Sequence, residues 1–259
     1  LVDVMTQNAE LMLFNMAGGR FSDLRLRQAV LCALDRSELI TNVYMNRAFA
    51  TDVPVAPDSW TYDAKSKQYD HDVVRAQALL ADMGFADTDE DGILEYPNSA
   101  NKLEFTLLVA RREAAAIIAS QLKEAGILVV VEAAAHSLAA ANSEYLTRLK
   151  NGEFDLALVS VNLPRNDDLG VLLRPNGSRN YGKANVPELV ALLDEMLACP
   201  AEGEYQAAAS RLQMKFVETL PFACLYFRMH SVICDSSIRN LDTLRKPDLL
   251  LGLEFWYFG

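Results

Sequence analysis

Basic residues are scarce in this sequence of 259 residues, where 24 Lys and Arg stand against 35 Asp and Glu for a formal net charge of −11. No basic run or basic, aromatic-studded patch is present that could neutralise phosphates, which argues against direct binding of nucleic acid. No apolar run approaches the roughly 20 residues that a membrane-spanning helix needs. With 51% hydrophobic residues the chain can still bury a sizeable core.

Cysteines are also few, and the motifs of common enzymes are missing. The four cysteines include no CxxC pair, and buried free thiols are the favoured interpretation, with a Cys224–Cys234 bridge across a hairpin as the alternative. There is no GxSxG elbow and no HExxH, and the three histidines share no ligand spacing. We therefore expect a protein that is not an enzyme and carries no cofactor.

One fragment of a nucleotide-binding motif is present, because residues 177–183 read GSRNYGK. Ala184 stands where a P-loop has the Ser or Thr that binds magnesium, and Pro187 comes too soon for the phosphate-binding helix to start on time. We interpret this stretch as an ordinary loop.

What the chain does contain is an alternation of strands and helices. An apolar strand, LMLFN, leads into a Gly-Gly loop, after which Asp23 and Asp35 can cap two consecutive helices. Asp70 is expected to cap a further helix that ends at Gly84, after a long loop over residues 47–69 that is typical of functional segments or of segments lying against a neighbouring surface.

From Leu103 the pattern becomes strand, helix, strand, helix, strand, which predicts an α/β fold with a parallel or mixed sheet flanked by helices. The strand ILVVV (127–131) is apolar at every position and is predicted in the middle of the sheet. The helix after it should present Leu138, Ala141, Tyr145 and Leu149 on one face. The tail predicts three strands, PFACLYF, HSVIC and LEFWYF.

An acidic turn separates the two halves of this pattern. Asp87, Asp89 and Asp91, followed by Gly92, reproduce the first half of a calcium-binding loop, but position 12 is Asn98, which cannot supply a bidentate carboxylate. A solvated turn is the favoured interpretation, and the triad is a weak calcium candidate.

Several segments together resemble the family 5 solute-binding proteins, the extracytoplasmic receptors of peptide and nickel ABC transporters. The resemblance is carried, in order and over nearly the whole chain, by FNMAGGRFSDLRLRQAVLCALDRSELI (14–40), YDHDVVRAQALLADMGFADTDEDG (69–92), AAIIASQLKEAGILVVV (115–131), GEFDLALV (152–159), NYGKANVPELVALLDEM (180–196) and LPFACLYF (220–227).

The resemblance implies a type II periplasmic-binding-protein-like fold, with residues 1–259 forming a single α/β lobe, the second of two, and the N-terminal lobe missing from this chain. It implies that a small peptide or other small polar solute is captured between the lobes and delivered to an ABC permease. The expected location is outside the cytoplasmic membrane, with a lipid anchor on the missing N-terminus. A solute-sensing domain of a transcription regulator is the alternative.

The ligand contacts of the family transfer only in part. In the peptide receptors an Asp soon after the strand corresponding to FDLALVSV pairs with the amino terminus of the peptide, and an ungapped count places Pro164 there. Asp167 or Asp168 could take that role, or the ligand lacks a free amine. Because ligands of open α/β sheets bind at strand ends, the candidate cleft residues are Asn15, Asn162, Arg165, Asn166, Asp167 and Tyr181.

Overall fold

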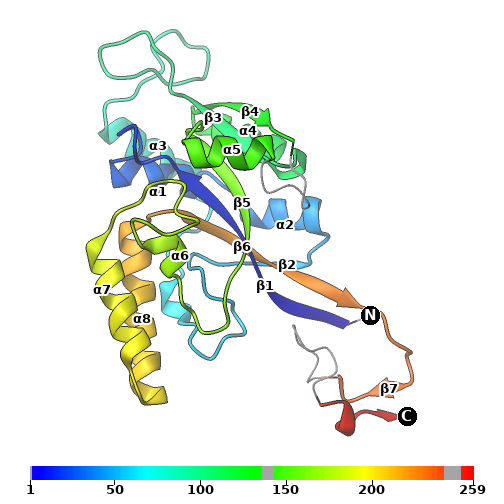
Figure 1. Ribbon diagram of the computed structural model, residues 1–259. Coiled ribbons are helices and arrows are strands. Elements are labelled where there is room, and N and C mark those ends of the chain that lie inside the picture. Colours follow the sequence, from blue (N-terminus) through cyan, green and yellow to red (C-terminus); the bar gives the residue numbers. More distant parts are fainter. Residues whose placement is uncertain (1, 136–142, 242–251) are drawn as a thin grey trace.

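The computed structural model describes residues 2–135, 143–241 and 252–259 (Figure 1). Its main feature is a six-stranded sheet in the order β2-β6-β1-β5-β3-β4. The strands are β1 (Val2–Phe14), β2 (Ala48–Ala50), β3 (Glu104–Val109), β4 (Leu128–Ala133), β5 (Leu156–Asn162) and β6 (Ala223–Val232).

The sheet is mixed, as the sequence pattern predicts. β3 pairs in parallel with both β4 and β5, whereas β1 runs antiparallel to β5 on one side and to β6 on the other. Two further short strands, β7 (Ile238–Arg239) and β8 (Tyr257–Phe258), form a separate two-stranded sheet near the C-terminus.

Helices flank the large sheet, and α7 and α8 pack side by side as an antiparallel pair in Figure 1. The helices are α1 (Leu24–Cys32), α2 (Arg36–Tyr44), α3 (Val73–Asp82), α4 (Glu113–Glu124), α5 (Glu144–Asn151), α6 (Gly170–Leu173), α7 (Pro187–Ala198) and α8 (Glu202–Thr219), with short 3-10 turns η1 (Ala64–Ser66) and η3 (Leu253–Phe255). Within the described ranges no helix is both long and apolar enough to span a bilayer.

The corner between β1 and α2 is held by the caps that the sequence predicts. The Asp23 carboxylate accepts a hydrogen bond from the Arg25 backbone N–H, and Asp35 accepts from the N–H groups of Ser37 and Glu38. These bonds satisfy amides that have no partner inside the first turn of a helix.

Arg27 of α1 lies in this corner with its guanidinium buried. It donates to the carbonyl oxygens of Phe21, Ser22, Thr219 and Leu220, so one side chain ties the start of α1 to the end of α8. The four charge-assisted bonds offset the cost of removing the cation from water.

β4 lies at the edge of the sheet, so the prediction that ILVVV occupies its middle is wrong. β4 pairs with β3 alone among the described strands, and the Val130 side chain is 42% exposed. The other face of β4 is covered by α4, and Val129 is buried there, which accounts for part of the apolar run.

Other local predictions also need correction. The cap of α3 is Asp72, whose carboxylate accepts from the Arg75 N–H, and Asp70 instead pairs with Lys67 on the surface. PFACLYF and HSVIC form one strand, β6, and LEFWYF forms η3 followed by β8. Of the predicted helix face, Tyr145 and Leu149 lie on α5, whereas Leu138 and Ala141 fall outside the described residues.

The alternative of a Cys224–Cys234 bridge is wrong, because all four cysteines are free thiols. Cys224 is near the start of β6 and Cys234 follows its end. At about 3.3 Å per strand residue the two lie roughly 30 Å apart, which is too far for a disulfide. Burial raises the pKa of the Cys224 thiol well above its ordinary value, which keeps it protonated and unreactive.

Candidate ligand-binding face

Four of the six predicted cleft residues follow one another at the carboxyl end of β5. Asn162, the last residue of the strand, is exposed and pairs in register with Asn8 of β1. The chain then turns over residues 163–169, where the Leu163 N–H donates to the carbonyl of Gln7. Arg165 and Asn166 are exposed at the tip of this turn.

Asp167 is a buried, charged residue of the turn. Its backbone is left-handed, with φ of 52°, and its N–H donates to the Pro164 carbonyl at 3.3 Å. Its carboxylate accepts a hydrogen bond of 2.6 Å from the Thr61 hydroxyl. Burial raises the pKa of Asp167, and the bond from Thr61 lowers it in part.

The loop that carries Thr61 is the long connection that the sequence predicts between α2 and α3, and it lies against α8. Gln213 of α8 donates from its side-chain amide to the Thr61 carbonyl at 2.7 Å and accepts from the Asp63 N–H at 3.0 Å. After the short strand β2 at its start, the connection has only the 3-10 turn η1, and these bonds fix it to α8 and to the turn after β5.

Trp60 and Tyr205 add an aromatic surface beside the turn. Their ring centroids lie 5.6 Å apart, Trp60 is 50% exposed, and the Tyr205 hydroxyl donates to the Asn166 carbonyl at 2.7 Å. Exposed aromatic rings next to amide groups are typical of sites for polar organic ligands. Sequence reasoning missed Trp60, although its position in a long loop is a signal of function.

A buried carboxylate lies further along the same two strands. Glu10 of β1 pairs with Ser160 of β5, whose hydroxyl donates to Glu10 Oε2 at 2.7 Å. Burial raises the pKa of Glu10, while the Ser160 bond and the charges of Arg228 and Arg111 lower it. The sequence gives no signal for this cluster, because its members come from three strands and the end of a fourth.

The two remaining predicted residues, Asn15 and Tyr181, are not brought to this face. Phe14 pairs with Leu156 at the amino end of β5, so Asn15 lies about 20 Å from Asn162 at roughly 3.3 Å per residue. The Asn15 amide donates to the carbonyls of Gly152 and Phe154. Tyr181 precedes Gly182, whose carbonyl accepts from the Met16 N–H at this same end.

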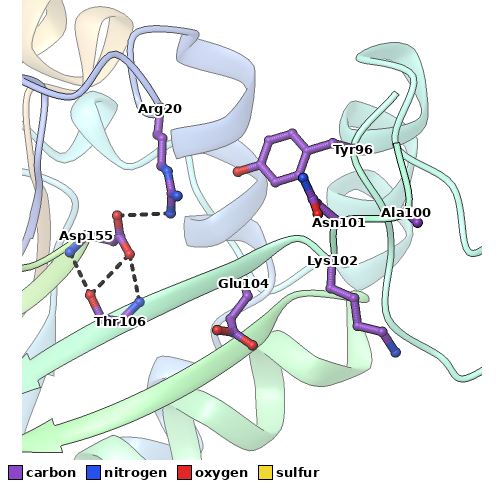
Figure 2. Close-up of a pocket in the computed structure, with 8 residues that line it drawn as sticks. All are labelled: Arg20, Tyr96, Ala100, Asn101, Lys102, Glu104, Thr106 and Asp155. Atoms are coloured by element: carbon purple, nitrogen blue, oxygen red, sulfur yellow. Dashed lines mark hydrogen bonds and ion pairs between the residues drawn. The ribbon is translucent and has the colours of Figure 1, made fainter. Parts of the chain in front are cut away.

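At that amino end the surface has an open depression of about 850 Å³, shown in Figure 2. Asp155 lines the depression and accepts hydrogen bonds from the Thr106 N–H and hydroxyl and from Arg20, while Tyr96 faces Arg20 from the opposite side. Ligands of open α/β sheets bind outside the carboxyl ends of the strands. We therefore take the carboxyl end of β5, with Trp60 and Thr61, as the candidate ligand-binding face.

Comparison with known proteins identifies the class. The model of the bacterial extracellular solute-binding proteins, family 5 (middle region), matches residues 2–183. The chain belongs to this family.

Particular relatives agree with this assignment. The oligopeptide-binding protein AppA of Bacillus subtilis is 25% identical over 249 residues, covering 92% of this chain and 45% of AppA. Heme-binding protein A of Haemophilus influenzae is 26% identical over 195 residues, covering 73% of this chain and 34% of that protein. The chain therefore spans less than half the length of these relatives.

Solved structures confirm the periplasmic-binding-protein fold. AppA in complex with a nonapeptide superimposes with a TM-score of 0.78 at 22% identity, covering 100% of this chain and 52% of the AppA chain. NikZ of Campylobacter jejuni in complex with Ni(L-His) gives a TM-score of 0.78 at 19% identity, covering 98% of this chain and 52% of NikZ.

Proposed function

We propose that this chain is one lobe of an extracytoplasmic solute-binding protein, which holds a small peptide or similar polar solute and delivers it to an ABC permease. The observation that carries the proposal is the family match over residues 2–183. It is supported by the relatives of known ligand: AppA is described with a nonapeptide, and NikZ with nickel bound to histidine.

The chemistry of the candidate face fits such a ligand. The side-chain amides of Asn162 and Asn166 can donate to and accept from a peptide backbone. The exposed guanidinium of Arg165 can bind a carboxylate with two parallel bonds, and the Trp60 ring can cover an apolar or cationic side chain. These are binding groups, and we propose that the protein makes and breaks no bonds.

We propose that residues 1–259 supply one wall of the site and that a second lobe supplies the other. The share of the relatives that this chain covers, 52% of the AppA structure, supports this arrangement. Closure of two lobes on a ligand is driven by contacts that exist only in the closed state. This lobe alone is therefore expected to bind peptides more weakly than about 1 μM.

Calorimetric titration of the 259-residue chain with a mixture of tri- to nonapeptides tests that expectation. Binding at micromolar affinity or tighter would contradict the two-lobed site. If instead the same peptides bind only when the chain is linked to a second lobe, Arg165→Ala and Trp60→Ala should each weaken binding at least tenfold. If both variants bind the peptides as tightly as the original chain, the ligand site does not lie on this face.

The alternative function is a solute-sensing domain of a transcription regulator, and such a domain would need the same fold and the same ligand-binding face. Sequencing the gene upstream of the Leu1 codon would separate the two: a lipoprotein signal with its cysteine would support transport and the expected lipid anchor, whereas a helix-turn-helix would support regulation.

A further inference from the structure

The acidic turn between α3 and β3 forms a compact cluster of carboxylates at the amino-end side of the sheet, away from the candidate ligand-binding face. One carboxylate oxygen from each of four residues lies within 4.8 Å of the others. The residues are Asp87, Asp89, Asp91 and Glu95.

The fourth member, Glu95, is not one of the three carboxylates that the sequence analysis singles out. Counted from Asp87 it is position 9, and the backbone brings it back because Ala86 and Glu95 exchange hydrogen bonds, with Glu95 N–H donating at 2.8 Å. Position 12 is the exposed Asn98, so the carboxylate missing there is replaced from within the turn.

Glu95 also carries an unsatisfied oxygen. The residue is 3% exposed, and its Oε2 accepts from the Thr88 N–H at 2.7 Å and from the Thr88 hydroxyl at 2.8 Å. Its Oε1 is buried and has no hydrogen-bond partner. A buried, unpaired carboxylate oxygen is costly, and a cation bound to it removes that cost.

The rest of the turn is already folded for such an ion. The Asp87 carboxylate accepts from the N–H groups of Asp91 and Gly92, and Asp91 accepts from the Ile93 N–H at 3.0 Å. Gly92 has φ of 85°, which permits the sharp turn after the third aspartate. These bonds hold the carboxylates together against their mutual repulsion.

Among the residues that the structure describes, Lys102 is the cation paired with this cluster. Lys102 pairs with Asp91 and lies 3.5 Å from Asp89 Oδ2. One positive charge faces four carboxylates, and the Lys102 side chain is partly exposed and also lines the neighbouring depression, so it can leave the cluster without being buried elsewhere.

We propose that Asp87, Asp89, Asp91 and Glu95 form a calcium site that fixes the turn between α3 and β3. Calcium binds oxygen ligands at about 2.3–2.6 Å, so two ligands on opposite sides of one ion lie up to about 5 Å apart, which the cluster satisfies. Four carboxylate oxygens, with no nitrogen or sulfur donor among the cluster residues, favour calcium over transition metals. The expected affinity is that of extracellular modules, a Kd of about 0.1–1 mM.

The test is thermal unfolding of the chelator-treated 259-residue chain, with and without 10 mM CaCl₂, at equal ionic strength set with KCl. Calcium should raise Tm by about 3–10 °C, because it binds the folded turn alone. Asp89→Asn should remove most of this shift. Glu90→Gln is the matched control, because Glu90 lies in the same turn, is exposed and stands outside the cluster.

Glu95→Gln examines the buried ligand and should also abolish the shift. If that variant fails to fold, Asp89→Asn still decides the question. Lys102→Met removes the competing ammonium and should tighten calcium binding several-fold in calorimetric titration. The proposal is overturned by an unchanged Tm in the original chain, by an equal shift in Asp89→Asn, or by an equal shift with 10 mM MgCl₂. None of these outcomes depends on the proposed solute-binding function.

Discussion

The Thr61 hydroxyl donates a hydrogen bond of 2.6 Å to the carboxylate of Asp167, across 106 residues of sequence. Both side chains are buried, and the bond joins the long loop before α3 to the turn after β5. It thereby fixes the relative positions of Trp60 and Asn166 on the candidate ligand-binding face.

Thr61→Val removes this donor while keeping the shape of the side chain. We expect the free energy of unfolding to fall by about 1–3 kcal/mol, because the buried carboxylate loses its side-chain hydrogen bond. Urea unfolding measures the change. Thr41→Val is the control, since the bond of Thr41 to Asn46 is exposed, and it should change stability by less than about 0.5 kcal/mol. If the two variants lower the free energy of unfolding equally, the hydrogen bond from Thr61 to Asp167 does not stabilise the fold more than an exposed one.

Stability should depend on pH through Glu10. Its pKa in the folded protein is raised, mainly by burial, so the folded state holds the proton more tightly than the unfolded state. The contribution to stability is complete below the unfolded pKa and is lost as pH rises through the folded pKa. The Glu10→Gln variant does not lose this contribution as pH rises, because a glutamine side chain does not titrate.

The stability of Glu10→Gln relative to the original chain should therefore increase between about pH 4 and pH 8 in urea unfolding. Glu204→Gln on the exposed surface of α8 is the comparison, and its difference from the original chain should stay nearly constant. A relative stability of Glu10→Gln that falls with rising pH would show that the arginine charges outweigh burial.

Arg36 and Asp52 form a buried ion pair of 2.6 Å, in which the Asp52 side chain is 0% exposed. Asp52 also accepts from the N–H groups of Gln68 and Tyr69. Asp52→Ala should reduce the free energy of unfolding by about 3–5 kcal/mol, because it leaves a buried guanidinium without its counter-ion.

The surface pair Lys67–Asp70 is the control for that experiment. Both of its side chains are more than half exposed, so Lys67→Ala should cost no more than about 1 kcal/mol. Denaturant unfolding of the two variants at equal salt compares them. A loss below about 1 kcal/mol for Asp52→Ala would show that water replaces its carboxylate.

Gly182 allows the loop before α7 to approach the end of β1. A Cβ atom at position 182 would lie 2.5 Å from the carbonyl oxygen of Phe14, which is closer than Cβ atoms come to other atoms in real proteins. Gly182→Ala should destabilise the protein by about 1–3 kcal/mol or more. Gly203→Ala, near the start of α8 with no atom within 4 Å of the added carbon, should be neutral or stabilising by up to about 1 kcal/mol. Thermal unfolding distinguishes them.

Local chemistry made part of this structure predictable. Asp23 and Asp35 cap helices, and the alternation of strands and helices after Leu103 gives the parallel strands β5, β3 and β4 of the sheet. Each of these features depends on bonds between residues a few positions apart or on which side chains must leave water. The resemblance to family 5 also rests on the sequence alone, and the family match confirms it.

Only the tertiary structure decided which of the candidate residues meet. Asn15 and Asn162 both end apolar strands, yet β1 is antiparallel to β5, so they lie at opposite ends of the sheet. β4 is as apolar as a central strand but lies at the edge, and α4 packs against one of its faces. Glu95 joins the acidic turn through its pairing with Ala86, and Thr61 reaches Asp167 through a fold contact. Such pairings depend on which distant segments pack together, and no local pattern of residues specifies them.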